Sequence, residues 1–222
     1  MPRKLKSSAR KSRRNRNMVL AIGLLAIVVV AIVLFLVFGQ SSPSNNNSGN
    51  NSTGLNNNSN STSSNGPTKV LLQTSMGSII IQLRDDMPIT TTNFKKLVQQ
   101  GTYNGTIFHR VIDDFMIQGG DPTGTGYGDP SIPNIEDEFS SNSTNNRNSR
   151  GTIAMANTGQ PNSGSSQFFI NVVYNSHLDN KHPVFGDVIE GMDVVDAISK
   201  VARDASDKPL QNVTIIKAEI LS

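Results

Sequence analysis

The feature that most constrains this chain is an uninterrupted apolar run near its start. Residues 18–38 carry no charged side chain and consist mostly of Leu, Ile, Val, Ala and Phe. A helix of this length spans about 30 Å, the thickness of a bilayer's hydrocarbon core, which predicts one transmembrane helix. Residues 1–17 hold eight Lys and Arg and no acid, a bias that keeps a segment on the cytoplasmic side. We therefore expect a single-pass membrane protein whose remainder is extracytoplasmic.

A cleaved signal peptide is the alternative interpretation of this run. The apolar region of a signal peptide usually covers about 7–15 residues and ends at a small-x-small site. Here the run is longer, and Phe38 is followed by Gly39, Gln40 and Ser41 without such a site. The sequence favours an uncleaved signal anchor.

Residues 39–68 form a polar, low-complexity segment. They contain ten Asn and nine Ser but no charged side chain. Such a segment buries too little surface to offset its ordering entropy, which predicts a disordered linker. Glycosylation sequons begin at Asn46, Asn50, Asn51, Asn57 and Asn60, although an Asn- and Ser-rich tract also produces such triplets by composition alone.

The charge of the chain is unevenly distributed. Beyond residue 17, twelve Lys and Arg face 17 Asp and Glu, a net charge of −5. A nucleic-acid binder needs a basic surface on its folded part, so we assign the basic tip to membrane topology and expect no nucleic-acid partner. The chain has no cysteine, which excludes a disulfide framework, a thiolate zinc site and a cysteine nucleophile.

From residue 69 to residue 222, short apolar runs alternate with Gly, Pro, Asn and Asp, the pattern of a strand-rich folded domain. Residues 70–74 and 78–83 are predicted to form a β-hairpin. Helices are expected from Pro88 to Gly101 and over 192–200, where apolar residues recur at helical spacing. Further strands are predicted at 107–112, 115–118, 152–156, 168–172, 184–188 and 213–221, and a surface loop at the Asn- and Ser-rich 140–149. Many short strands with two helices indicate a closed, mainly β barrel or sandwich.

Two dense segments carry the candidate chemistry. Arg110 lies inside an otherwise apolar strand, where a guanidinium needs either a function or a partner such as Asp113 or Asp114. Gln167 and Phe169 share one face of a later strand. An amide beside an aromatic ring suits binding of a peptide backbone, but core packing explains the ring equally well.

Other chemistries fit the sequence poorly. The histidines at 109, 177 and 182 lack the spacing of a helical metal-binding pair, so no metal site is predicted. Residues 124–128, Gly-Thr-Gly-Tyr-Gly, lack the Lys-Ser/Thr ending of a Walker loop. A serine nucleophile elbow is absent from the sequence.

These segments resemble the cyclophilins, a family of peptidyl-prolyl cis-trans isomerases. The resemblance covers about residues 70–221 and rests on several motifs in family order: Phe-His-Arg at 108–110 with Phe-Met-Ile-Gln-Gly-Gly-Asp at 115–121, Met-Ala-Asn at 155–157, Ser-Gln-Phe-Phe at 166–169, and Leu-Asp, His and Val-Phe-Gly within 178–186. It implies a closed eight-stranded antiparallel β-barrel with a helix at each end. It also implies proline-containing polypeptides as partners and no cofactor.

The resemblance assigns roles to particular residues. The expected catalytic set is Arg110, Phe115 and Gln118. The pocket for the proline ring corresponds to Phe115, Met116, Phe169, Leu178 and His182, and the positions that hold the substrate backbone correspond to Gln118, Ala156, Asn157 and Gln167.

The sequence departs from the family pattern at two places beside the expected site. His177 stands where many eukaryotic members carry a tryptophan that contacts cyclosporin. The resemblance therefore does not extend to cyclosporin sensitivity. The loop 158–165 is about one residue longer than usual, and we expect it to shift the preference for the residue before proline.

We therefore expect a monomeric, membrane-anchored prolyl isomerase that assists folding outside the cytoplasm. Its predicted parts are a basic cytoplasmic tip (1–17), a transmembrane anchor (18–38), a disordered linker (39–68) and an isomerase domain (69–222). The alternative is a non-catalytic module that binds proline peptides at the cell surface. A third interpretation, a cell-surface adhesion protein, rests on the linker alone and predicts partner binding that survives loss of Arg110.

Overall fold

The computed structural model describes residues 66–221. The predicted cytoplasmic tip, the predicted transmembrane anchor and nearly all of the predicted linker lie outside these residues. Within 66–221, no helix combines the length and the apolar character needed to cross a membrane.

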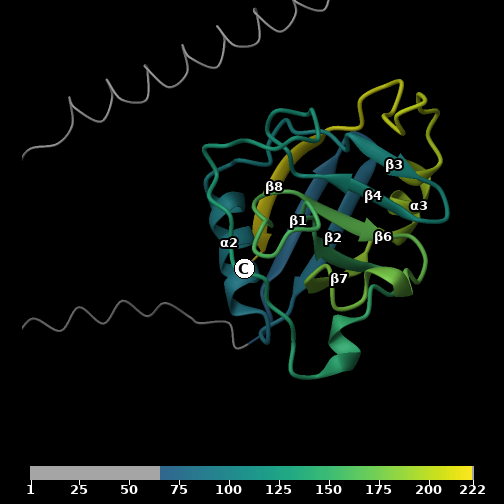
Figure 1. The fold of residues 1–222 in the computed structure, drawn as a ribbon. Coiled ribbons are helices and arrows are strands. Elements are labelled where there is room, and N and C mark those ends of the chain that lie inside the picture. Colours follow the sequence, from purple (N-terminus) through teal and green to yellow (C-terminus); the bar gives the residue numbers. More distant parts are fainter. Residues whose placement is uncertain (1–65, 222) are drawn as a thin grey trace, which may run out of the picture. The chain divides into compact units, whose positions relative to one another are not determined.

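Eight antiparallel strands form one sheet in the order β3-β4-β6-β5-β7-β2-β1-β8. The strands are β1 (Lys69–Thr74), β2 (Gly77–Leu83), β3 (Arg110–Ile112), β4 (Met116–Gly119), β5 (Thr152–Met155), β6 (Phe168–Asn171), β7 (Val184–Glu190) and β8 (Ile215–Leu221). The sheet curls around its core as a half-barrel (Figure 1). The predicted antiparallel, mainly β architecture is confirmed.

The two edges of the sheet meet without a strand ladder, which corrects the prediction of a closed barrel. Ile107, just before β3, forms isolated bridges with Thr214 and with Asp121. The Phe108 N–H donates to the Val213 carbonyl at 2.9 Å. The predicted strand 107–112 is therefore only partly confirmed. Ile107 forms the two isolated bridges, and only residues 110–112 pair with β4.

Two α-helices flank the sheet, as predicted (Figure 1). Helix α2 (Pro88–Gln99) begins with proline in its first turn and packs against β8, because proline fits a position whose N–H has no helical acceptor. Helix α3 (Met192–Ser199) contacts β2, β3 and β4. It follows Gly191, whose φ is +88°, and a Cβ at this position would lie 2.2 Å from the Ser78 carbonyl oxygen. Only glycine fits there.

Strand alternation separates the main core from a second apolar cluster. Ile117 of β4 and Phe168 of β6 face the main core, whereas their sequence neighbours Met116 and Phe169 belong to the separate cluster, because successive strand residues point to opposite faces. The Phe168 ring lies in the middle of an aromatic group, with centroids 5.7, 5.6 and 6.4 Å from those of Phe94, Tyr103 and Phe108.

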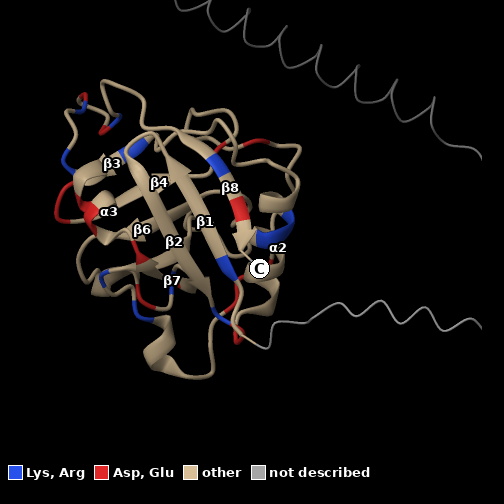
Figure 2. Ribbon diagram, turned by 180° about the vertical axis from the view of Figure 1, so that it is seen from behind, with Lys and Arg blue, Asp and Glu red and all other residues tan. Residues whose placement is uncertain are grey.

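The charged residues of the folded part are scattered. On the face seen in Figure 2, basic and acidic residues are interspersed along the strands and helices, and the described residues form no continuous basic stripe there.

Candidate active site

The register of the sheet assembles a row of side chains from distant segments. Arg110 of β3 lies opposite Gln118 of β4, Gln118 lies opposite Phe169 of β6, and Phe169 lies opposite Ala154 of β5. Directly opposed residues of antiparallel strands project from the same face of a sheet. The row therefore brings a cation, an amide and an aromatic ring together on the outer face.

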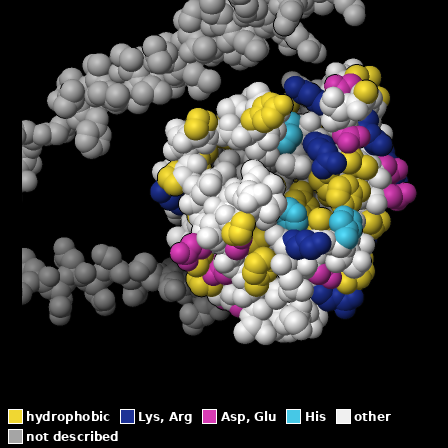
Figure 3. Space-filling view, viewed as in Figure 1, with side chains coloured by type: hydrophobic (Ala, Val, Ile, Leu, Met, Phe, Trp, Pro, Cys, Tyr) yellow, Lys and Arg dark blue, Asp and Glu magenta, His cyan; other side chains and the backbone are white. Residues whose placement is uncertain are grey.

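Beside this row lies an apolar patch, the second cluster noted above. It consists of Met116, Ala154, Phe169 and Val184, with Ile112, Phe115, Ala156 and Leu178 packed against it. Figure 3 shows hydrophobic side chains gathered in a hollow of this face, with basic and histidine side chains around it. Five of the ten predicted site residues thus meet in one patch.

Arg110 lies at the edge of this patch between a ring and a carboxylate. Its guanidinium carbon is 5.9 Å from the centroid of the Phe115 ring, and its Nε is 3.6 Å from Asp207 Oδ2. Asp207 Oδ1 also pairs with Arg203 Nε at 3.3 Å. The acidic partner is therefore Asp207, and not the neighbouring Asp113 or Asp114. No local sequence pattern could have indicated it, because Asp207 is distant in the chain.

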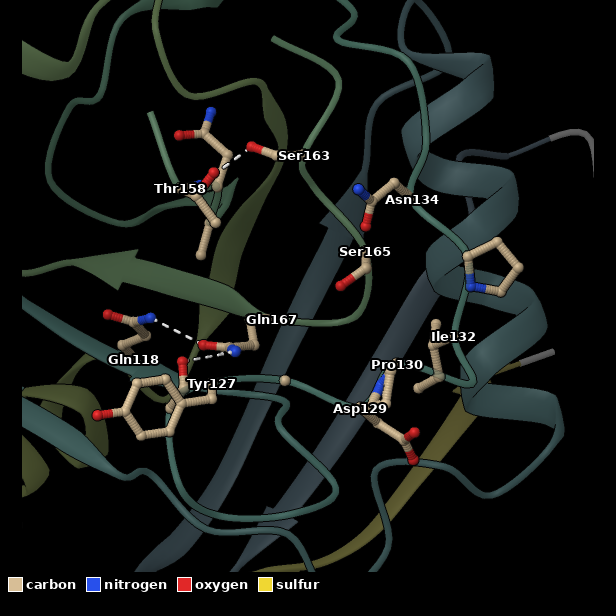
Figure 4. A pocket seen from close by; sticks show the side chains of 15 residues that line it. Gln118, Tyr127, Asp129, Pro130, Ile132, Asn134, Thr158, Ser163, Ser165 and Gln167 are labelled. Carbon is tan, nitrogen blue, oxygen red and sulfur yellow. Dashed lines mark hydrogen bonds between the residues drawn. The ribbon is translucent and has the colours of Figure 1, made fainter. Parts of the chain in front are cut away.

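Two amides define a polar groove next to the row. Gln118 Nε2 donates to Gln167 Oε1 at 3.0 Å, and Gln167 Nε2 donates to the Gly126 carbonyl at 3.1 Å. They line a cavity of about 590 Å³ together with Ala156 and Thr158 (Figure 4). Gln167 is hydrogen-bonded to Gln118, and Gln118 lies opposite Phe169 on the outer face. Gln167 and Phe169 therefore share a face, as predicted.

Asn157 lies in the wall of the groove, but its side chain is engaged within the protein. Its Nδ2 donates to the Lys181 carbonyl at 2.9 Å, and its Oδ1 accepts from the Gly159 N–H at 3.1 Å. These two bonds connect the loops that carry Lys181 and Gly159, and they leave one Nδ2 proton and one Oδ1 lone pair of Asn157 free.

The glycine-rich segment after β4 folds around a carboxylate of the chain itself. Asp121 is fully buried, and its Oδ2 accepts from the N–H groups of Gly126 and Gly128 at 2.7 and 3.2 Å. Burial alone would raise the pKa of Asp121, but these N–H groups and Thr123 outweigh it and lower the pKa. Asp121 thereby fixes the loop whose Gly126 carbonyl anchors Gln167.

Two histidines lie at the rim of the apolar patch. The His182 ring stands edge-on to Phe169 with centroids 5.3 Å apart, and its Nδ1 is 3.1 Å from the Met155 carbonyl oxygen. Because a carbonyl can only accept, Nδ1 carries the proton. Burial lowers the pKa of His182 despite this hydrogen bond, so the ring is neutral at pH 7. His177 stacks on Phe115 with centroids 5.6 Å apart.

Behind the patch runs a chain of buried asparagines that the sequence analysis missed. Asn148 Nδ2 donates to the Leu178 carbonyl at 3.0 Å. Asn171 Nδ2 donates to Asn148 Oδ1 at 3.2 Å, and Asn175 Nδ2 donates both to Asn171 Oδ1 and to the Phe115 carbonyl. The three asparagines are 0, 0 and 5% exposed. This asparagine chain joins the segments that carry Phe115 and Leu178, on two sides of the patch.

The same finding corrects the prediction that 140–149 is simply a surface loop. Ser140, Asn146 and Asn148 are buried, and the segment includes the short 3-10 helix η1 (Ser143–Asn146). Asparagine is abundant both here and in the predicted linker, so composition could not distinguish solvated side chains from buried ones.

The comparisons with known proteins identify the family of the domain. Residues 69–220 match the family model described as cyclophilin type peptidyl-prolyl cis-trans isomerase. Over 153 residues the chain is 46% identical to a peptidyl-prolyl cis-trans isomerase of Schizosaccharomyces pombe, covering 68% of this chain and 98% of the relative. It is 44% identical to the Homo sapiens peptidyl-prolyl cis-trans isomerase-like 1, covering 68% of this chain and 92% of the relative.

A solved structure shows the same fold. The crystal structure of a cyclophilin-type isomerase from Cryptosporidium parvum matches with a TM-score of 0.66 and 32% identity, covering 71% of this chain and 99% of the other. The same protein was also crystallised in the presence of the dipeptide Ala-Pro.

The curled antiparallel sheet is shared with a solved cyclophilin-type isomerase, and the relatives at 44 and 46% identity are peptidyl-prolyl cis-trans isomerases. Together these matches define an isomerase of peptide bonds before proline. The chain belongs to the cyclophilin-type peptidyl-prolyl cis-trans isomerase family.

Proposed function

We propose that the chain accelerates rotation about X–Pro bonds of polypeptide clients and that Arg110 is the residue that acts on the prolyl nitrogen. The observation that carries this assignment is the position of Arg110, a cation held at the edge of an apolar patch and in register with Gln118 and Phe169. The Ala-Pro dipeptide used with the Cryptosporidium relative supports proline peptides as the substrate class.

The chemistry explains why an arginine suffices. Rotation about the bond crosses a barrier of ~18–20 kcal/mol because amide resonance must be broken. A hydrogen bond donated to the prolyl nitrogen favours the pyramidal form of this atom, in which the resonance is lost. Because this donor is strongest toward the twisted state, it lowers the barrier and not only the energy of the bound ground state.

The other site residues bind and orient the substrate in this proposal. The patch formed by Phe115, Met116, Phe169 and Leu178 takes the proline ring, with His182 at its rim. Gln118 and Gln167 hold the peptide backbone on one side of the bond, since both amides face the polar groove. One half of the substrate is then fixed while the other half rotates.

Catalysed exchange of an Ala-Pro-Phe peptide, followed by NMR with the full-length protein, tests this function. Turnover between the cis and trans signals supports the isomerase. Line-broadening from binding without catalysed exchange would instead leave the non-catalytic proline-peptide module, and the search would turn to the partner that it holds.

The cellular setting is a separate part of the proposal. The basic segment 1–17 and the apolar run 18–38 support a single-pass anchor with the isomerase domain on the extracytoplasmic side, where a monomeric enzyme would assist the slow proline steps of folding. Protease added to intact cells should release the domain from its anchor. Protection of the domain there, together with cleavage after permeabilisation, would reverse this topology.

A further inference from the structure

A second cavity, the side pocket, lies on the other side of the loop that borders the polar groove. It has a volume of about 410 Å³, and its polar lining includes His109, Arg110, Gln118, Tyr127, Ser206 and Lys208. It shares Gln118, Gly126 and Tyr127 with the polar groove. Because Arg110 belongs both to this lining and to the proposed reaction site, a substrate bound at Arg110 has residues within reach of the side pocket.

The lining of the side pocket is cationic. It contains Arg110 and Lys208 but no Asp or Glu. Lys208 has no carboxylate within ion-pair distance among residues 66–221, and Ser206 contributes an exposed hydroxyl. These groups can donate to an anion.

Two acids near the side pocket, Asp204 and Asp207, already have partners within the protein. Asp207 is shared between Arg110 and Arg203. Asp204 Oδ1 accepts from the backbone N–H groups of Ser206 and Lys208 at 2.8 and 3.0 Å. Arg110, Arg203 and Lys208 against Asp204 and Asp207 leave a net charge of +1 around the opening.

Asp121 is not among the residues that line the side pocket, but its carboxylate is buried near the pocket and keeps its negative charge. The buried carboxylate of Asp121 accepts hydrogen bonds from Thr123, Gly126 and Gly128 within its own loop. His109 also lines the cavity. Its burial lowers its pKa, so the ring is neutral at pH 7, and the positive potential comes from Arg110 and Lys208.

From this geometry we propose that the side pocket is a subsite for a carboxylate, which selects client segments that carry Asp or Glu within a few residues of the proline. The proposal rests on the isomerase function proposed above and specifies its substrate class. The attraction acts between partly exposed charges, so it is expected to change kcat/KM by only about 3–10-fold and to be screened by salt.

The test compares Glu with Gln in otherwise identical proline peptides, with the Glu or Gln placed in turn at each of the three positions on either side of the Ala-Pro unit. NMR exchange gives kcat/KM for each peptide with the full-length protein. We expect Glu to be preferred over Gln by about 3–10-fold at one or two positions and the preference to disappear at about 1 M salt. The Glu/Gln ratio is internal to each protein, so a general loss of activity cancels.

Charge reversal then locates the effect. Lys208→Glu should abolish or invert the Glu/Gln ratio, whereas Lys69→Glu, the same charge change on an exposed residue of β1 outside both cavities, should leave the ratio as in the wild type. A Glu/Gln ratio near one at every position would overturn the subsite, and so would a Glu preference that survives Lys208→Glu. In either case, exchange of the Gln peptides still reports the isomerase activity itself. Absence of exchange for all peptides would instead contradict the proposed function itself.

Discussion

The guanidinium of Arg110 is constrained by two neighbours of different chemistry. The Phe115 ring lies 5.9 Å from its central carbon, and Asp207 lies 3.6 Å from its Nε. The Asp207 backbone also accepts from the Val111 N–H at 2.8 Å, which ties the carboxylate-bearing turn to β3. In the proposed mechanism Asp207 is therefore a positioning residue, which would act on the substrate through Arg110.

Asp207→Ala should lower kcat by about two- to fivefold and leave KM for a neutral peptide nearly unchanged. The pair is partly exposed, so its loss costs no more than ~1 kcal/mol. Steady-state isomerase kinetics of the variant measure this split. Asp85→Ala, at an exposed acid elsewhere on the domain, is the matched control. A kcat identical to the wild type would show that Asp207 does not position Arg110.

We expect protonation of His182 to make the activity sensitive to acid. Burial holds the pKa of His182 below its usual 6.5, so the unfolded chain takes up the proton before the folded one does. Stability from this group is therefore fully present above about pH 6.5 and decreases as the pH falls toward the lowered pKa. Protonation also places a charge beside Phe169, which should weaken proline binding.

We therefore expect kcat/KM to fall on the acid side of pH 6.5 in the wild type, and this acid limb to be absent or much reduced in His182→Gln. The measurement is the pH profile of both proteins between pH 5 and 8. His109, whose pKa burial also lowers, is present in both, so it serves as the internal control. The same acid limb in both proteins would assign the effect to another group.

At the scale of the elements, the asparagine chain adds side-chain hydrogen bonds between β4, β6 and β5, which are already neighbours in the sheet. Asn148, Asn171 and Asn175 connect the start of β5, the end of β6 and the segment before β4. A buried amide network of this kind stabilises only while every member is satisfied. The walls of the apolar patch are therefore fixed from behind.

Asn148→Ala should lower the free energy of unfolding by ~1–3 kcal/mol, because it removes a donor to the Leu178 carbonyl and leaves an Asn171 amide proton without its acceptor. Chemical denaturation measures the loss. Asn212→Ala, at an exposed asparagine, should stay within about 0.5 kcal/mol of the wild type. Equal stability of the two variants would contradict the structural role of the chain.

Sequence patterns predicted the elements well where the pattern is local. The strand over 168–172 and the helix after Pro88 follow from alternation and from a helix-start residue, and each matches the structure within a few residues. Arg110 and Phe169 were candidates from their local patterns, and the resemblance to the cyclophilins assigned their roles. Asp207 and Asn148 were not, since their roles depend on contacts between segments that only the folded sheet brings together.

At the scale of the whole domain, the two faces of the sheet carry two separate apolar clusters. The inner face carries the aromatic group around Phe168, and the outer face carries the patch around Phe169. In the proposed function, stability and substrate binding therefore depend on adjacent residues that point in opposite directions.

Phe168→Ala should reduce the free energy of unfolding by ~3–5 kcal/mol, since it removes a fully buried ring from contact with Phe94, Tyr103 and Phe108. Phe169→Ala should cost less stability but raise KM, because its ring belongs to the smaller outer cluster. Thermal denaturation and isomerase kinetics of both variants separate the two effects. The reverse pattern would mean that the faces are assigned wrongly.

The central claim is that the outer-face row catalyses X–Pro rotation through Arg110. Its most direct test is NMR exchange of an Ala-Pro-Phe peptide with the full-length protein, Arg110→Ala and Arg147→Ala, where Arg147 is an exposed arginine stacked on Tyr174. We expect Arg110→Ala to lower catalysed exchange at least ~100-fold, about 2.7 kcal/mol, and Arg147→Ala to keep the wild-type rate. Catalysed exchange that survives Arg110→Ala unchanged would contradict the claim.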